Sequence, residues 1–164
     1  MTNELNQESG NMTKAESTVA GYSGTPLAKK LGIKPGHRLA ILGVAVGWAI
    51  PDLPEAVVFV MDDSSRVDVV LAFFCEAAEL ISDIAGLSER IFPVGSLWIA
   101  WPRKAAGHAS DISENLLRNF ALPLGIVDVK VAAIDNDWSG LKFVWRVEHR
   151  KLLSPPLPGN VFDD

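Results

Sequence analysis

Apolar runs of strand length alternate with stretches of helical spacing along the second half of the chain. The strand-like runs occupy residues 67–74, 96–101, 126–134 and 141–148. Between the first two runs, Leu80, Ile84 and Ile91 recur at helical spacing, which predicts a helix over residues 76–91. A second helix is predicted from Asp111, and the last two runs form a hairpin. This order predicts an open α/β sheet.

The first half of the chain is more irregular. Thr25-Pro26 resembles an N-cap followed by proline at the first helical position, so we expect a short helix through Leu31. A first strand is predicted over residues 37–42. Two glycines and two prolines in residues 43–54 then predict a loop in place of a regular helix.

A second strand is predicted over residues 56–61, where apolar side chains on both sides indicate cover on both faces. Only residues 62–66 separate it from the run at residues 67–74, whereas a parallel crossover usually needs a dozen residues. Either the chain recrosses without a helix and the two strands are parallel, or they form a hairpin. We favour the parallel arrangement.

The second helix begins in Asp111-Ile112-Ser113-Glu114, which matches a capping box. Asp111 is expected to cap the helix while Glu114 reaches back to its amide. The same two carboxylates are also a candidate pair for acid–base chemistry, but capping explains both more simply.

In the predicted hairpin, apolar residues alternate with polar ones, which indicates one buried face and one wet face. The apolar set is Val127, Val129, Val131 and Ala133. We expect cross-strand ion pairs among Asp128, Lys130, Lys142, Arg146 and Glu148.

Length and composition indicate one globular domain. The chain has 164 residues, is 48% hydrophobic and carries a net charge of −5, which argues against nonspecific nucleic-acid binding. We divide it into a polar tail over residues 1–20, an α/β domain over residues 21–150 and a C-terminal tail over residues 151–164. One cysteine, no apolar leader and no membrane-length segment predict a cytoplasmic protein that contacts no membrane.

Charged and aromatic residues gather where the predicted strands end, and ligands of open α/β sheets bind beyond the carboxyl ends of strands. The candidate ligand-binding residues are Trp101, Arg103, Lys104, Asp135, Trp138 and Ser139. Arginine and lysine here favour an anion, and an indole offers a stacking face. The alternative is that the tryptophans pack over the sheet while the cations stay solvated.

A partial cofactor fingerprint follows the first strand. Gly43 and Gly47 lie in the turn, and Asp62 ends the second strand, where an acid binds ribose hydroxyls in adenosine-cofactor sites. A third glycine is missing, and prolines interrupt the helix whose amino end would hold a phosphate. We therefore predict no cofactor from this pattern alone.

Other catalytic patterns are incomplete. Cys75 ends a strand and His108 lies after the next, but no nucleophile elbow or oxyanion glycine accompanies them, so we expect a buried, inert cysteine. The histidines His37, His108 and His149 lack metal-ligand spacing, so no metal site is predicted.

Several motifs resemble a bacterial family known as domain of unknown function 3052. The resemblance spans about residues 20–150. It rests on the stretches at residues 20–27 and 30–36, on Trp101-Pro102-Arg103-Lys104, on residues 127–131 and on residues 138–143. The family name implies no activity, so the resemblance bears on domain boundaries.

The predicted element order also looks like the second half of a class I methyltransferase, in which the last strand inserts antiparallel beside its predecessor. The expected fold is therefore a Rossmann-like, three-layer α/β domain with a mostly parallel sheet ending in an antiparallel hairpin, a truncated methyltransferase-like architecture. This is an analogy of architecture and does not by itself imply activity.

Three functions follow as hypotheses. The first is a non-catalytic domain that binds a small anionic molecule or a protein partner at the strand-end cleft. The alternative is a transferase that uses S-adenosylmethionine. The third is an oligomerisation module, a homodimer held by a sheet edge or by the hairpin face that carries Phe143 and Trp145.

Overall fold

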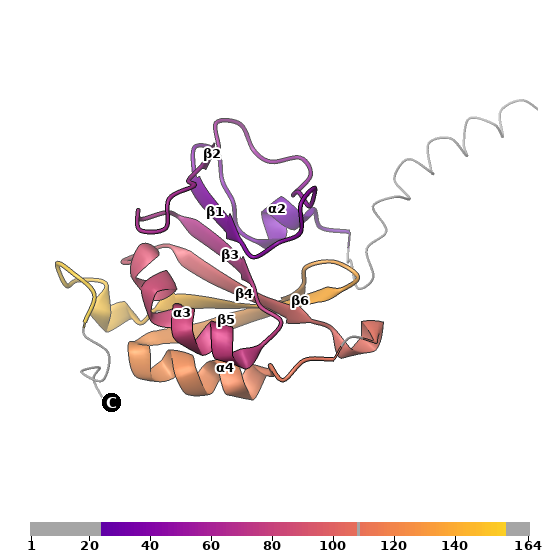
Figure 1. Ribbon diagram of the computed structural model, residues 1–164. Coiled ribbons are helices and arrows are strands. Elements are labelled where there is room, and N and C mark those ends of the chain that lie inside the picture. Colours follow the sequence, from indigo (N-terminus) through magenta and orange to yellow (C-terminus); the bar gives the residue numbers. More distant parts are fainter. Residues whose placement is uncertain (1–23, 108, 157–164) are drawn as a thin grey trace, which may run out of the picture.

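The computed structural model describes residues 24–107 and 109–156, and its centre is a six-stranded sheet of order β2-β1-β3-β4-β6-β5 (Figure 1). The strands are β1 (Arg38–Leu42), β2 (Val58–Phe59), β3 (Val69–Phe73), β4 (Ser96–Pro102), β5 (Ile126–Ala133) and β6 (Trp138–Trp145). The α-helices are α2 (Leu27–Lys30), α3 (Ala77–Arg90) and α4 (Glu114–Ala121), and 3₁₀ turns span Lys104–Ala106, Leu122–Leu124 and Val147–His149. The expected tail at residues 1–20, His108 and residues 157–164 lie outside the described residues.

The pairing confirms a mostly parallel sheet with an antiparallel end. Strands β1 to β4 are parallel, and β6 inserts antiparallel between β4 and β5. Strands β2 and β3 both pair with β1, one on each side, so the parallel arrangement is right and the hairpin is wrong. The chain recrosses through residues 60–68 without a helix.

Arg90 explains how so short a crossover is held. This side chain is buried, and its guanidinium donates to the main-chain carbonyls of Ser65 and Asp62, each at 2.9 Å. A buried cation that satisfies loop carbonyls replaces the hydrogen bonds that a crossover helix would supply internally.

The second strand differs most from its prediction. Only Val58 and Phe59 pair with β1, and about half of each side chain is exposed. An apolar run therefore does not imply burial here, because β2 lies at the edge of the sheet, with no strand beyond it in the described residues.

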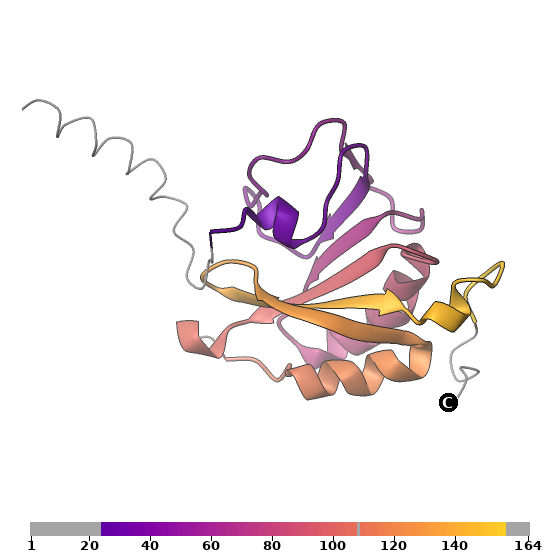
Figure 2. The same ribbon diagram turned by 180° about the vertical axis from the view of Figure 1, so that it is seen from behind.

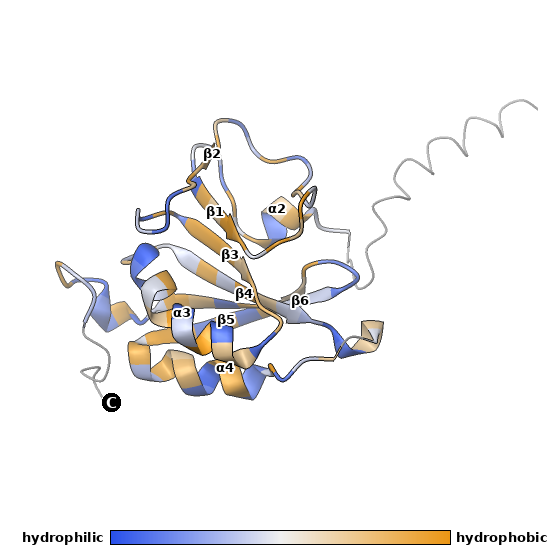
Figure 3. Cartoon of the chain, in the orientation of Figure 1, coloured by the Kyte–Doolittle hydropathy of each residue, from blue (hydrophilic) through white to orange (hydrophobic). Residues whose placement is uncertain are grey.

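Two apolar layers cover the sheet. Helices α3 and α4 pack on one face, and α2 with the loop at residues 43–54 packs on the other, as the two opposite views show (Figures 1 and 2). Buried indoles connect the layers to the sheet. Trp98 Nε1 donates to the carbonyl of Leu31 at 3.1 Å, and Trp145 Nε1 donates to that of Ser88 at 2.9 Å. In Figure 3, β1 and β3 are mostly apolar, as expected for strands inside a parallel sheet.

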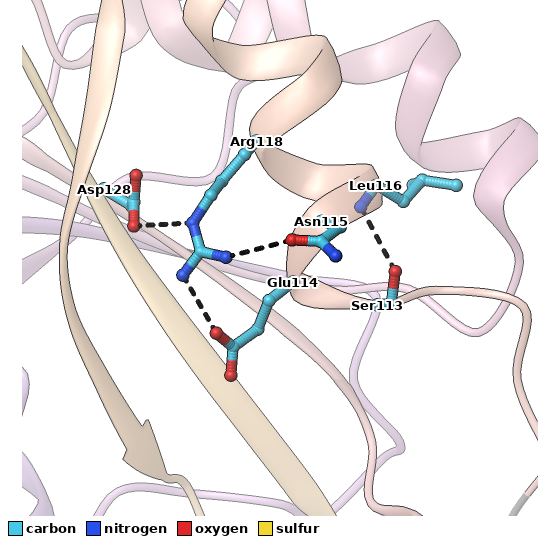
Figure 4. A network of polar contacts seen from close by, with 6 residues as sticks. All are labelled: Ser113, Glu114, Asn115, Leu116, Arg118 and Asp128. Atoms are coloured by element: carbon cyan, nitrogen blue, oxygen red, sulfur yellow. Dashed lines mark hydrogen bonds and ion pairs between the residues drawn. The ribbon is translucent and has the colours of Figure 1, made fainter.

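The helix caps correct two predictions. Ser113, not Asp111, caps α4, and its hydroxyl accepts from the amide of Leu116 (Figure 4). Asp111 instead accepts from the amide of Ala77 at 2.8 Å, so it caps the neighbouring helix α3. The expected cap of the first helix is also wrong, because Pro26 occupies the N-cap of α2.

Glu114 does not reach back to an amide. It pairs with Arg118 at 2.9 Å, and Arg118 also holds Asp128 of β5 at 2.9 Å (Figure 4). Arg146 pairs locally with Glu148 at 3.3 Å. The predicted cross-strand ion pairs are therefore wrong, because Lys130 faces Lys142, a like charge.

The hairpin is shifted from its predicted boundaries. Strand β6 already begins at Trp138, and a bulge between Asp128 and Lys130 breaks the alternation in β5. Val129 and Val131 are consequently half exposed. Phe143 and Trp145 are fully buried against α3 and α4, so the hairpin face proposed for dimerisation belongs to the core. Among the described residues, no helix is long and apolar enough to cross a membrane.

Candidate functional site

Two of the predicted site segments meet at the carboxyl end of β4. The amide of Arg103 donates to the carbonyl of Asp137 at 2.8 Å, and its guanidinium lies 3.4 Å from the carbonyl of Asp135. Arg103 thus contacts the loop between β5 and β6. Whether these residues bind a ligand stays a prediction.

Arg103 lines a concave surface of about 480 Å³, here called the basic cleft. Its lining consists of Thr25, Lys30, Arg103, Lys130, Val131, Ala132, Ala133 and Ser139. Three of these residues are cationic and two carry hydroxyl groups, and no carboxylate occurs among the described residues of the lining. The surface can therefore donate many hydrogen bonds to an anion.

Two further lysines, Lys34 and Lys142, extend the positive charge beyond the lining of the cleft. Lys130 and Lys142 are register partners on β5 and β6, and the ammonium of Lys30 donates to the carbonyl of Ala133 at 3.1 Å. Burial and then Lys130 lower the pKa of Lys30, and burial followed by Lys130 and Lys34 lowers the pKa of Lys142. These four lysines, here called the lysine cluster, form a positive neighbourhood on an acidic protein.

The crevice between the ends of β1 and β3 is the point where the order of the strands reverses, where doubly wound sheets bind ligands. On the α2 face its own side chains fill it. The ring of Phe73 packs edge-on between Trp48 and Trp138, with centroids 5.1 and 4.9 Å away. Trp48 Nε1 also donates to Asp135 at 3.0 Å.

The partial cofactor fingerprint has structural roles. Gly43 has a φ of +76°, and a Cβ there would lie against the carbonyl oxygen of Phe73, so the turn admits only glycine. Gly47 also has a positive φ, in an open loop. The Ser65 hydroxyl and the amides of Ser64 and Ser65 donate to Asp62 and lower its pKa to about 2. Its carboxylate orders a turn.

The remaining candidates divide between core and surface. Trp101 is buried on the α3 face, while Trp138 packs on the α2 face, so the two indoles do not line one cleft. Asp135 accepts from the amides of Asp137 and Trp138, so it orders the loop. Lys104 is exposed in the 3₁₀ turn, and Ser139 lines the basic cleft.

A larger hollow of about 790 Å³ opens on the other face, between α3 and the ends of β1 and β3. Its apolar floor includes Leu42, Phe74 and Leu87, and its rim carries Asp63, Glu79 and Asp83. We call it the acidic groove. Two surfaces of opposite charge, the basic cleft and the acidic groove, thus lie on opposite faces near the strand ends.

The other sequence candidates are a cysteine and histidines. Cys75 is exposed, contrary to its prediction, and the position of His108 lies outside the described residues. His149 is buried against Trp145, with ring centroids 6.1 Å apart. Among the described residues, no three His, Cys, Asp or Glu side chains group as metal ligands.

Sequence reasoning missed Lys30, Lys130 and Trp48 as parts of the strand-end region. Lys130 and Lys142 face each other because of the register of the hairpin, so their proximity was predictable from the sequence. Trp48 and Asp135 lie 87 positions apart in the sequence, so no local pattern predicts their contact.

Solved structures similar to this one include methyltransferases and fibrillarin. The CcbJ methyltransferase from Streptomyces caelestis is 11% identical, with a TM-score of 0.51, over 74% of this chain and 88% of that one. A Synechocystis magnesium protoporphyrin IX methyltransferase with bound SAH is 16% identical, with a TM-score of 0.48, over 68% and 75% of the chains. Aeropyrum pernix fibrillarin with bound S-adenosyl-L-methionine is 15% identical, with a TM-score of 0.45, over 72% and 73%.

No family model matches the chain, and no curated protein matches it. The fold is methyltransferase-like, a truncated Rossmann-like α/β domain. At these identities the likeness shows the fold alone.

Proposed function

We propose that this chain is a non-catalytic, methyltransferase-like domain that binds a small anionic ligand in the basic cleft. The observation that carries the proposal is the gathering of Lys30, Arg103 and Lys130 around one concave surface whose described lining has no carboxylate. Like charges so close together repel one another, and a bound anion relieves that repulsion.

The side chains that fill the crevice on the α2 face support the non-catalytic part of the proposal. Trp48 and Phe73 occupy the α2 side of the switch point, and hydrogen bonds engage the Asp62 carboxylate that would otherwise face ribose hydroxyls. On the α2 face, a ligand at the strand ends therefore meets the basic cleft, while the acidic groove, which Gly43 also lines, opens on the other face.

Calorimetry with inorganic phosphate and pyrophosphate tests the proposal. We expect Lys30→Gln to weaken pyrophosphate binding about tenfold, which corresponds to about 1.4 kcal/mol. Lys29→Gln is the matched control, because Lys29 is exposed on the same helix and does not line the cleft. Equal affinities of the two variants, or no binding of either anion to the wild-type protein, would refute the proposal.

The second candidate is a transferase that uses S-adenosylmethionine, favoured by the fold shared with methyltransferases. It predicts calorimetric binding of S-adenosylmethionine or its demethylated product near Gly43 and Gly47. Removing the indole that fills the crevice, in Trp48→Ala, would then change the affinity. No heat at millimolar ligand removes this candidate.

A further inference from the structure

The acidic groove exists because one face of the sheet is incompletely covered. Inner strands of parallel sheets are normally covered on both faces. Here α3 and α4 cover one part of their face, and Figure 1 shows no helix in front of β1 and β2 among the described residues. Leu42 is only partly buried, although it packs against the apolar core of this face.

The wall of the groove suits a helix. Ala78, Ser82 and Gly86 line it at four-residue spacing and therefore form one row along α3. All three are exposed, and a Cβ added at Gly86 would have nothing within 4 Å. Small side chains let a second helix approach within the usual interaxial distance of about 8–10 Å.

The charges at the rim of the groove indicate which kind of helix can bind there. The rim carries Asp63, Glu79 and Asp83, and the cation among the described lining residues, Arg90, is buried and donates to the crossover carbonyls. The complementary surface is therefore apolar along its centre and basic along its flanks.

The chain's own remaining segments have the wrong charge for this position. Residues 1–23 contain three glutamates and one lysine, and residues 157–164 contain two aspartates and no cation. Pro155 and Pro156 line a hollow that shares Asp63, Gly86 and Arg90 with the groove, so the C-terminal segment starts nearby but carries the same sign of charge as the rim.

We propose that the acidic groove docks an amphipathic, basic α-helix of a partner protein. Its apolar side chains contact Leu42, Phe74 and Leu87, and its lysine or arginine side chains meet Asp63, Glu79 and Asp83. This site is separate from the basic cleft and lies on the opposite face of the sheet.

The probe is a synthetic amphipathic helical peptide of leucine and lysine, compared with a peptide that carries glutamate at every lysine position. Binding to the full chain is measured by calorimetry, and the contacts are mapped by amide NMR shifts. We expect the lysine peptide to bind, to shift the amides of Ala78, Ser82 and Gly86, and to weaken as salt increases. The glutamate peptide is expected not to bind.

Two variants test the place of binding. Gly86→Leu fills the groove from a helical position, so it should preserve folding and reduce peptide affinity at least tenfold. Asn119→Leu adds the same side chain to an exposed site on α4 and should leave the affinity unchanged.

A second pair tests the charge. The double substitution Glu79→Lys with Asp83→Lys should weaken binding at least tenfold, whereas Glu55→Lys, at a residue that precedes β2 and does not line the groove, should not. The proposal is wrong if both peptides bind alike, if neither binds, if Gly86→Leu binds normally, or if deleting residues 157–164 is required to expose the groove.

Discussion

Lys130 and Lys142 face each other across β5 and β6, with Lys34 near enough to affect the second of them. Like charges in direct cross-strand register usually destabilise a sheet. Burial and the charge of Lys130 both lower the pKa of Lys142, as expected for two ammonium groups that repel each other. At the scale of single residues, these lysines make the surface positive at the expense of folding stability.

Replacing Lys142 with glutamine should therefore stabilise the protein while weakening anion binding. The expected gain in the free energy of unfolding is up to about 1 kcal/mol, since one like-charge pair is removed. Denaturant unfolding measures it, with Lys151→Gln, at an exposed position, as the control. A loss of stability would show that packing of the lysine stem outweighs the repulsion.

At the scale of elements, helix α3 depends on a residue outside its own sequence neighbourhood. Its N-cap Glu76 makes no side-chain cap hydrogen bond, and Asp111 supplies one from the loop before α4. The carboxylate also lies at the positive end of the α3 dipole. The two helices on this face are thereby joined by a cap as well as by apolar contacts.

Asp111→Ala should consequently destabilise the protein by about 1 kcal/mol, although the residue is exposed. Glu114→Ala should cost less, because its pair with Arg118 is a surface interaction. Thermal unfolding of both variants measures the difference. If the two variants lose equal stability, the cap on α3 is energetically unimportant.

Elements with strong local patterns were predictable, and those determined by distant partners were not. The α3 periodicity, the buried strand β4 and the final hairpin all follow from the sequence. The run at residues 56–61 has the composition of a buried strand, yet nothing local reveals that the sheet stops there. Asp111 likewise matches a local cap, while its partner lies 34 positions away.

In the candidate site too, contacts between residues distant in the sequence were not predictable. The positions of Arg103 and Ser139 were predictable, because the amino end of the antiparallel strand β6 lies beside the carboxyl end of β4. Lys30 was missed, since its contact with Ala133 joins residues 103 positions apart. Asp135 and Trp138 were correctly placed at the strand ends, but the structure gives them packing and hydrogen-bonding roles that composition does not reveal.

At the scale of the whole molecule, an acidic chain separates its charges onto two surfaces. The net charge is −5, yet the lysine cluster concentrates cations on the α2 face, while Asp63, Glu79 and Asp83 border the opposite groove. Such a distribution steers an anion and a basic segment toward different faces. The two proposed interactions are therefore compatible, and either is testable without the other.

The lysine cluster also predicts how stability changes with pH. The pKa values of Lys30 and Lys142 are lower in the folded protein than the ordinary 10.5 of the unfolded chain. Between the lowered values and 10.5 the unfolded state binds more protons, so the contribution of these groups to stability rises with pH. Relative to Lys30→Gln with Lys142→Gln, the wild-type protein should gain stability across this alkaline window.

The stabilisation that phosphate gives should decrease as the pH rises over the same alkaline range. A bound anion favours the charged ammonium groups, so the stabilisation it gives is largest while both lysines are protonated and fades as they lose their protons. Thermal unfolding with and without phosphate, from about pH 7 to about pH 10.5, measures both trends. A phosphate effect that is independent of pH, or equal in the double variant, would place the bound anion away from these lysines.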